Sequence, residues 1–149
     1  MYMQDLEIAK KRLNENSLSL SIVKNGEIVF ETASHGVSGF LEAIEMLRNK
    51  LEDASAADRI VGKAIALLCV YAKVKAIYAK VLSENAKGVL EENMIYHEWK
   101  SLVENILDAS KTELCPFEKL ATKISSPKAA YARLRALQIS LRHSQMKAK

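Results

Sequence analysis

Polar side chains at the start of a long apolar run are the first candidates for chemistry in this sequence. The run extends from Asp58 to Tyr71 and includes Gly62 and Lys63 near its beginning. It has almost no polar face, which predicts a central helix that is buried on most sides. Unpaired N–H groups at the first turn of such a helix favour an anionic or strongly polar ligand group, and Lys63 would add a charge. Ser55 lies in the polar and alanine-rich connection before the run. With Asp58 three residues later, it is predicted to form a capping box at the start of this helix.

A second candidate position follows a predicted strand over residues 75–82. Ser83 and Glu84 come directly after this strand and open the next predicted helix. In open α/β sheets, ligands bind beyond the carboxyl ends of parallel strands, where helix N-termini point. If the chain is an enzyme, Lys63 would stabilise negative charge, and Asp58 or Glu84 would act as acid or base. The alternative is that the serine and aspartate side chains only cap helices, which is their common role there.

The third candidate is a cysteine at the predicted start of a later helix. Cys115 precedes Pro116, a residue type favoured at the first helical position, and Lys119 follows one turn on. A helix N-terminus and a nearby cation stabilise a thiolate, so Cys115 is a candidate nucleophile. The alternative is a capping or half-buried thiol. Cys69 lies inside the apolar run and is expected to be an inert core residue.

Metal and cofactor motifs are absent from the sequence. His35, His97 and His143 are scattered, and no CxxC or HxE pair is present. The glycine-rich signatures of dinucleotide and phosphate binding are also missing. We therefore expect no metal and no cofactor.

Composition favours one soluble globular domain over residues 1–149. The chain is 49% hydrophobic and 27% charged, with a net charge of +4 that is concentrated near the C-terminus. Because no aromatic residues interleave with the C-terminal arginines, nucleic-acid binding is not expected, and RNA association through the last helix is the weakest option considered. No run reaches the roughly 18 apolar residues of a membrane span, and no signal peptide is evident. Two cysteines without a disulfide framework fit a reducing compartment, so we expect a cytoplasmic protein.

Hydrophobic periodicity predicts a mixed α/β architecture. Residues 17–24 and 27–34 alternate around Asn25-Gly26, the strongest short-range signal of a β-hairpin. Further strands are expected over residues 75–82 and 94–99. A helix is predicted between them, so the two strands should run parallel in a βαβ unit. Helices are also predicted over residues 2–14, 38–51, 101–107 and 127–145, and another is predicted to begin at Pro116. A polar loop is predicted at residues 108–114. This order predicts a mixed sheet with helices on both faces.

Three segments of the sequence together resemble a known family. They are NGEIVFETASHG, the long segment from DRIVGKAIALL to VLEEN, and ELCPFEKLA. Their shared pattern is similar to that of the DUF1893 family of small uncharacterised prokaryotic proteins, over roughly residues 17–130. The resemblance implies a cytidine deaminase-like fold, a three-layer α/β/α sandwich. It also implies that one pocket is lined by Asp58, Gly62, Lys63, Ser83, Glu84, Cys115 and Glu118.

The same resemblance limits the function that can be carried over. Zinc deaminases place H/C-x-E on the helix after the hairpin and P-C-x-x-C after the next strand, and this chain departs from that pattern at every ligand. We therefore expect a metal-free deaminase-like domain that binds a small polar ligand, nucleotide- or nucleobase-like in type. The alternative is a non-catalytic regulatory or protein-interaction module on the same scaffold. Deaminase-like folds often form oligomers, so a homodimer is expected by analogy alone.

Overall fold

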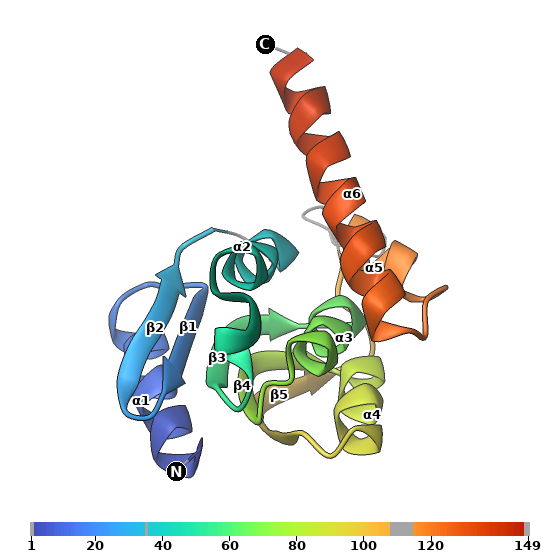
Figure 1. Cartoon of the computed structure of the whole chain (residues 1–149). Helices are drawn as coiled ribbons and strands as arrows, with labels where there is room; N and C mark the ends of the chain where they lie inside the picture. Colours follow the sequence, from blue (N-terminus) through green and yellow to red (C-terminus); the bar gives the residue numbers. More distant parts are fainter. Residues whose placement is uncertain (1, 35, 108–114, 148–149) are drawn as a thin grey trace.

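A five-stranded mixed sheet forms the centre of the protein (Figure 1). The computed structural model describes residues 2–34, 36–107 and 115–147. Its elements, in chain order, are α1 (Tyr2–Glu15), β1 (Leu20–Lys24), β2 (Glu27–Thr32), α2 (Val37–Leu47), the 3-10 helix η1 (Arg48–Leu51), β3 (Ser55–Val61), α3 (Lys63–Ala72), β4 (Ala76–Ser83), α4 (Glu84–Glu92), β5 (Tyr96–Val103), α5 (Pro116–Ala121) and α6 (Pro127–Lys147).

The strands lie in the order β2-β1-β3-β4-β5. β1 pairs antiparallel with both β2 and β3, whereas β3, β4 and β5 run parallel. The predicted hairpin is confirmed, with Asn25 and Gly26 at φ of 53° and 79°. Both residue types tolerate this left-handed conformation, which a two-residue hairpin turn requires. The parallel βαβ unit is also confirmed, with α4 between β4 and β5.

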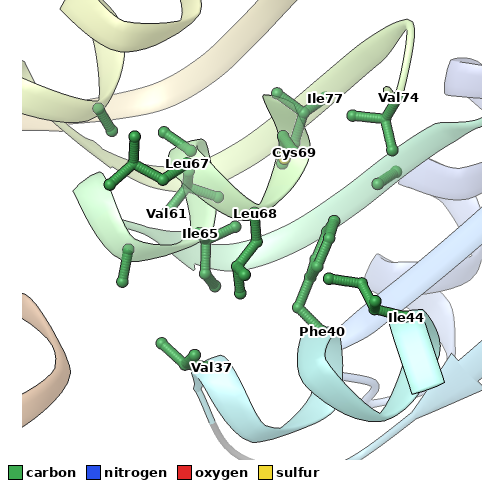
Figure 2. Packing of buried hydrophobic residues seen from close by; sticks show 14 of the residues in the cluster. Val37, Phe40, Ile44, Val61, Ile65, Leu67, Leu68, Cys69, Val74 and Ile77 are labelled. Atoms are coloured by element: carbon green, nitrogen blue, oxygen red, sulfur yellow. The ribbon is translucent and has the colours of Figure 1, made fainter. Parts of the chain in front are cut away.

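Helices cover both faces of the sheet, which confirms the predicted α/β architecture. α1 packs its Leu6, Ala9 and Leu13 against one face, on a small cluster that includes Ala57 and Tyr78. The larger core lies on the other face, where α3 is central. Figure 2 shows side chains from α3, including Ile65 and Leu68, beside Phe40 and Ile44 of α2 and Ile77 of β4. The apolar run therefore forms the buried helix expected of it.

The sheet contains one strand, β3, that the sequence patterns do not predict. Residues 55–61 were predicted as a polar connection and the start of the central helix, but they form β3 between β1 and β4. The central helix begins at Lys63 rather than at Asp58. Ala56 and Ala57 are fully buried, one on each face of the sheet, because helices pack on both sides of this strand. Small side chains suit that position, although they give little local strand signal.

Other boundaries also differ from the prediction. β5 continues to Val103, so the helix predicted over residues 101–107 is wrong. Ser38 lies inside α2, whose N-cap is Gly36. The predicted starts of α5 and α6 at their prolines are confirmed. The loop predicted at residues 108–114 lies outside the described residues.

α6 extends beyond the rest of the protein at its C-terminal end (Figure 1). Gln138 is buried, and residues 139–144 after it are all exposed. Across the described ranges of the chain, no helix is both long enough and apolar enough to cross a membrane.

Candidate functional site

A pocket of about 330 Å³ lies beside the C-terminal half of β3. Its wall combines residues of β3, the N-terminal ends of α2 and α3, the segment before residue 108, and α5. Most of the lining is apolar, with a few polar groups. The residues are Ser19, Gly36, Val37, Asp58, Arg59, Ile60, Gly62, Ile65, Ile106, Leu107, Cys115, Phe117 and Glu118. We refer to it as the Asp58 pocket.

Asp58 is the most unusual residue of this pocket. It points from β3 to the α3 side of the sheet and is only 4% exposed. Its Oδ1 accepts a hydrogen bond from the backbone N–H of Ile60 at 3.2 Å. Its Oδ2 is buried without a hydrogen-bond partner among the described residues. Burial raises the pKa of Asp58 to about 8, although backbone hydrogen bonds and Arg59 oppose this rise. The carboxyl group is therefore mostly protonated at neutral pH, and Oδ2 is available as a donor.

Glu118, which is distant in sequence, caps the N-terminus of α3 with its side chain. Its carboxylate accepts hydrogen bonds from the backbone N–H groups of Lys63 at 3.0 Å and Ala64 at 2.9 Å. Burial raises the pKa of Glu118, and these two hydrogen bonds partly counteract that effect. The N–H groups that were expected to be free for an anionic ligand are thus bound by the protein's own carboxylate.

Gly62 makes room for that carboxylate. A Cβ atom on Gly62 would lie 2.3 Å from Oε1 of Glu118, far inside contact distance. Gly62 is the N-cap of α3 and has an ordinary negative φ of −100°. Its lack of a side chain therefore serves the close approach of Glu118 rather than an unusual backbone conformation.

The two cysteines have different environments. Cys115 is half-buried at the N-cap of α5 and lines the Asp58 pocket. Its proposed role as a nucleophile stays a prediction. Cys69 lies in α3 with no exposed surface, and burial raises the pKa of its thiol well above the usual value. Asp58, once ionised, acts in the same direction, so the Cys69 thiol stays protonated.

Lys63 and Glu84 line a different depression from Asp58. They face a polar cleft of about 700 Å³ between α3, α4 and the connection from α5 to α6. Ser83 is buried beside it, where its hydroxyl accepts a hydrogen bond from Ala86 N–H and caps α4, as predicted. The structure therefore divides the expected single pocket into two sites, with the first turn of α3 between them.

Ser55 belongs to neither depression. It is the first residue of β3 and is fully buried. It is six residue steps from Val61 at the other end of the strand, a distance of about 20 Å along the strand. The capping role predicted for Ser55 is wrong because the residue lies inside the sheet rather than before a helix.

A family model described as a domain of unknown function (DUF1893, TM1506) matches residues 8–137. The chain belongs to the DUF1893 family. The resemblance inferred from the three sequence segments is thereby confirmed. No curated protein matches this DUF1893 protein.

Solved structures give a second comparison. A DUF1893 family protein, TM1506 from Thermotoga maritima, is 26% identical, with a TM-score of 0.83 and 91% of each chain covered. Two forms of Acinetobacter baumannii RibD are 19% identical, with TM-scores of 0.47 and 0.44. They cover 82% and 83% of this chain and 36% of the RibD chain.

Several pocket residues of this DUF1893 protein were not singled out from its sequence. Ile60, Ile65, Ile106 and Phe117 supply apolar walls. One available signal was Ile60-Val61 before Gly62, since a β-branched pair followed by glycine is typical of a strand end. Within the described ranges, no group of three or more histidine, cysteine, aspartate or glutamate residues could hold a metal ion.

Proposed function

We propose that this DUF1893 protein binds a small, polar, uncharged ligand of nucleobase or nucleoside type in the Asp58 pocket, without a metal. The observation that carries the proposal is the buried Oδ2 of Asp58, which lacks a partner within the described ranges. A buried polar atom without a hydrogen bond costs about 1–3 kcal/mol. A ligand that supplied the missing partner would recover that free energy on binding.

The charges around the pocket favour a neutral ligand. Asp58 and Glu118 are both buried acids in its wall, and Glu118 already uses its oxygens to cap α3. A phosphate or other anion would be repelled by the Glu118 carboxylate, whereas a neutral heterocycle would not. Arg59 also lines the pocket, but its guanidinium donates to the backbone carbonyl oxygens of Leu18 and Leu13. The protonated Oδ2 can donate to a carbonyl oxygen or ring nitrogen, which are acceptors that nucleobases carry.

The apolar walls suit the faces of a flat ring. Three apolar side chains of the wall come from different elements: Ile60 from β3, Ile65 from α3 and Phe117 from α5. The volume of about 330 Å³ is at the lower end of the range for small-molecule sites. An apolar pocket with a few polar groups is the common form of such sites.

Both cysteines are free thiols, which supports a cytoplasmic location.

The proposal is tested by calorimetry and thermal shift against free nucleobases and nucleosides. We expect at least one compound to raise Tm and to bind equally well with a chelator present. Asp58→Leu removes every hydrogen-bonding group at this position and should weaken binding by about tenfold or more, since one buried hydrogen bond is worth about 1.4 kcal/mol. Asp58→Asn keeps a donor beside Oδ1 and should retain most of the affinity.

Glu84→Gln is the matched control, because Glu84 lies in the other cleft. It should leave binding unchanged. No response to any compound, or equal binding by Asp58→Leu and the unmodified protein, would refute the proposal. Product analysis after incubation with a bound compound separates an enzyme from a binding module.

A further inference from the structure

The outer edge of β5 presents a regular strand with exposed apolar side chains. β5 is the last strand of the sheet and keeps one constant register with β4 along its length. Tyr96, Trp99 and Leu102 on this strand are 37%, 39% and 41% exposed. α1 packs mainly on β1, β3 and β4, and Lys10 is its residue that reaches Glu98 of β5. No strand of the described part of the chain pairs with the outer edge of β5, and such an edge is a template for pairing with another strand.

The side chains of β5 divide between the two faces of the sheet. Glu98 lies on the α1 face, since it accepts a hydrogen bond from Lys10 of α1 at 2.8 Å. Trp99 lies on the opposite face, where Lys87 of α4 sits 5.6 Å from its ring centroid. Strand alternation then places Tyr96 on the face of Glu98. These assignments fix which side chains could meet across a pair of β5 strands.

The sequence of β5 is complementary to itself about Trp99. If two copies pair antiparallel with Trp99 opposite Trp99, then Glu98 of one copy lies opposite Lys100 of the other, on the same face. In the same register, Tyr96 lies opposite Leu102. Opposite charges and aromatic–aliphatic pairs at directly facing positions stabilise antiparallel strands. The Glu98–Lys100 and Tyr96–Leu102 pairs each occur twice because the arrangement has two-fold symmetry.

The backbone supports the same register. The N–H of Tyr96 donates to Lys75 O, so it points toward the β4 side of the strand. Alternation along a regular strand turns the N–H and C=O groups of His97, Trp99 and Ser101 to the outer edge. With Trp99 opposite Trp99, these groups become hydrogen-bonded pairs. The charged and apolar pairs then fall at the non-hydrogen-bonded positions, where facing side chains lie closest.

The other edge of the sheet lacks these properties. β2 carries an irregularity in its pairing with β1, opposite Ile22 and Val23. A bulge of this kind hinders an edge strand from pairing with a further strand. A symmetric antiparallel pair centred on Val29 would also place Glu27 opposite Glu31, with like charges facing. β5 is therefore the better suited of the two edge strands for pairing between two copies of the chain.

We propose that two copies of this chain pair antiparallel through β5, about a two-fold axis at Trp99, to form one continuous sheet across the dimer. Analytical ultracentrifugation should give about twice the 16.6 kDa mass of the chain. Trp99 is the single tryptophan of the sequence and reports directly on this contact. Its emission should shift to shorter wavelength as protein concentration rises and the dimer forms.

Two variants test the register and the edge. Lys100→Glu places like charges opposite Glu98 at both symmetric positions and should return the mass to that of one chain. Ser101→Pro removes an outward N–H while leaving the β4 side of the strand unchanged, and proline is tolerated at such edge positions. It should have the same effect, with an unchanged circular dichroism spectrum. Lys128→Glu, at an exposed residue of α6, carries the same charge change as Lys100→Glu and should remain dimeric.

Two results would overturn this proposal. One is a single-chain mass for the unmodified protein at every concentration. The other is a dimer whose mass and Trp99 emission are unaffected by Lys100→Glu and Ser101→Pro, which would place the contact elsewhere.

Discussion

Replacing Asp58 with asparagine should remove a pH dependence of stability that one buried carboxyl group creates. The pKa of Asp58 is about 8 in the folded protein against 3.8 for an unperturbed aspartate. Below pH 3.8 both the folded and the unfolded states hold the proton, so the stabilising contribution is fully present. As pH rises, the unfolded state releases its proton first, and stability is lost until Asp58 also ionises near pH 8.

The expected size of this effect is large compared with typical stabilities. Each pH unit between the two pKa values changes the free energy of unfolding by about 1.4 kcal/mol. From pH 5 to pH 7, the unmodified protein should therefore lose about 3 kcal/mol relative to Asp58→Asn, which cannot ionise. Domains of this kind are stable by about 5–15 kcal/mol in total. Burial raises the pKa of Glu118 too, but that contribution is common to both proteins and cancels in the difference.

Urea unfolding followed by circular dichroism at pH 5, 6 and 7 measures this difference. Both proteins are compared at one protein concentration, so that any self-association is common to them. Asp53→Asn, at an exposed residue, controls for the loss of a carboxylate in general. A constant difference in unfolding free energy across these pH values would show that Asp58 is not a buried, protonated acid in the folded protein.

Two further predictions concern the walls of the Asp58 pocket. Gly62→Ala should destabilise the protein by about 1–3 kcal/mol in the same unfolding assay, because its Cβ displaces Glu118 from the N–H groups of α3. Gly88→Ala, in open space within α4, should instead stabilise by about 0.5–1 kcal/mol, and equal effects of the two changes would contradict this reasoning. Thiol titration should find one reactive cysteine in the folded protein, Cys115, and two after unfolding. Reaction of Cys69 in the folded state would contradict its complete burial in α3.

Local sequence patterns were sufficient for elements whose signal is repeated or specific. The hairpin was predictable because Asn25-Gly26 defines one turn type. The last two helices were predictable from prolines at their first positions. β3 was missed since its identity depends on pairing with β1 and β4 and on burial on both faces, and neither is visible in a short alanine-containing segment.

The site was partly predictable for a similar reason. Asp58, Gly62, Cys115 and Glu118 share the Asp58 pocket, as the family resemblance implied for a larger set that also included Lys63 and Glu84. The division into two depressions could not be foreseen, because it depends on one contact between residues 55 positions apart in the sequence. Residue types at helix starts indicate capping or binding, but they do not reveal which distant group satisfies those N–H atoms.

The contact between Glu118 and α3 can form only late in the synthesis of the chain, after the sheet has been made. All five strands lie before residue 104, so the sheet can assemble while the segment from Pro116 onward is still being synthesised. At that stage α3 has two open backbone donors and the pocket has no outer wall. Completion of the cavity is therefore among the last folding events, and a chain ending before Pro116 should retain the sheet without any ability to enclose a small molecule.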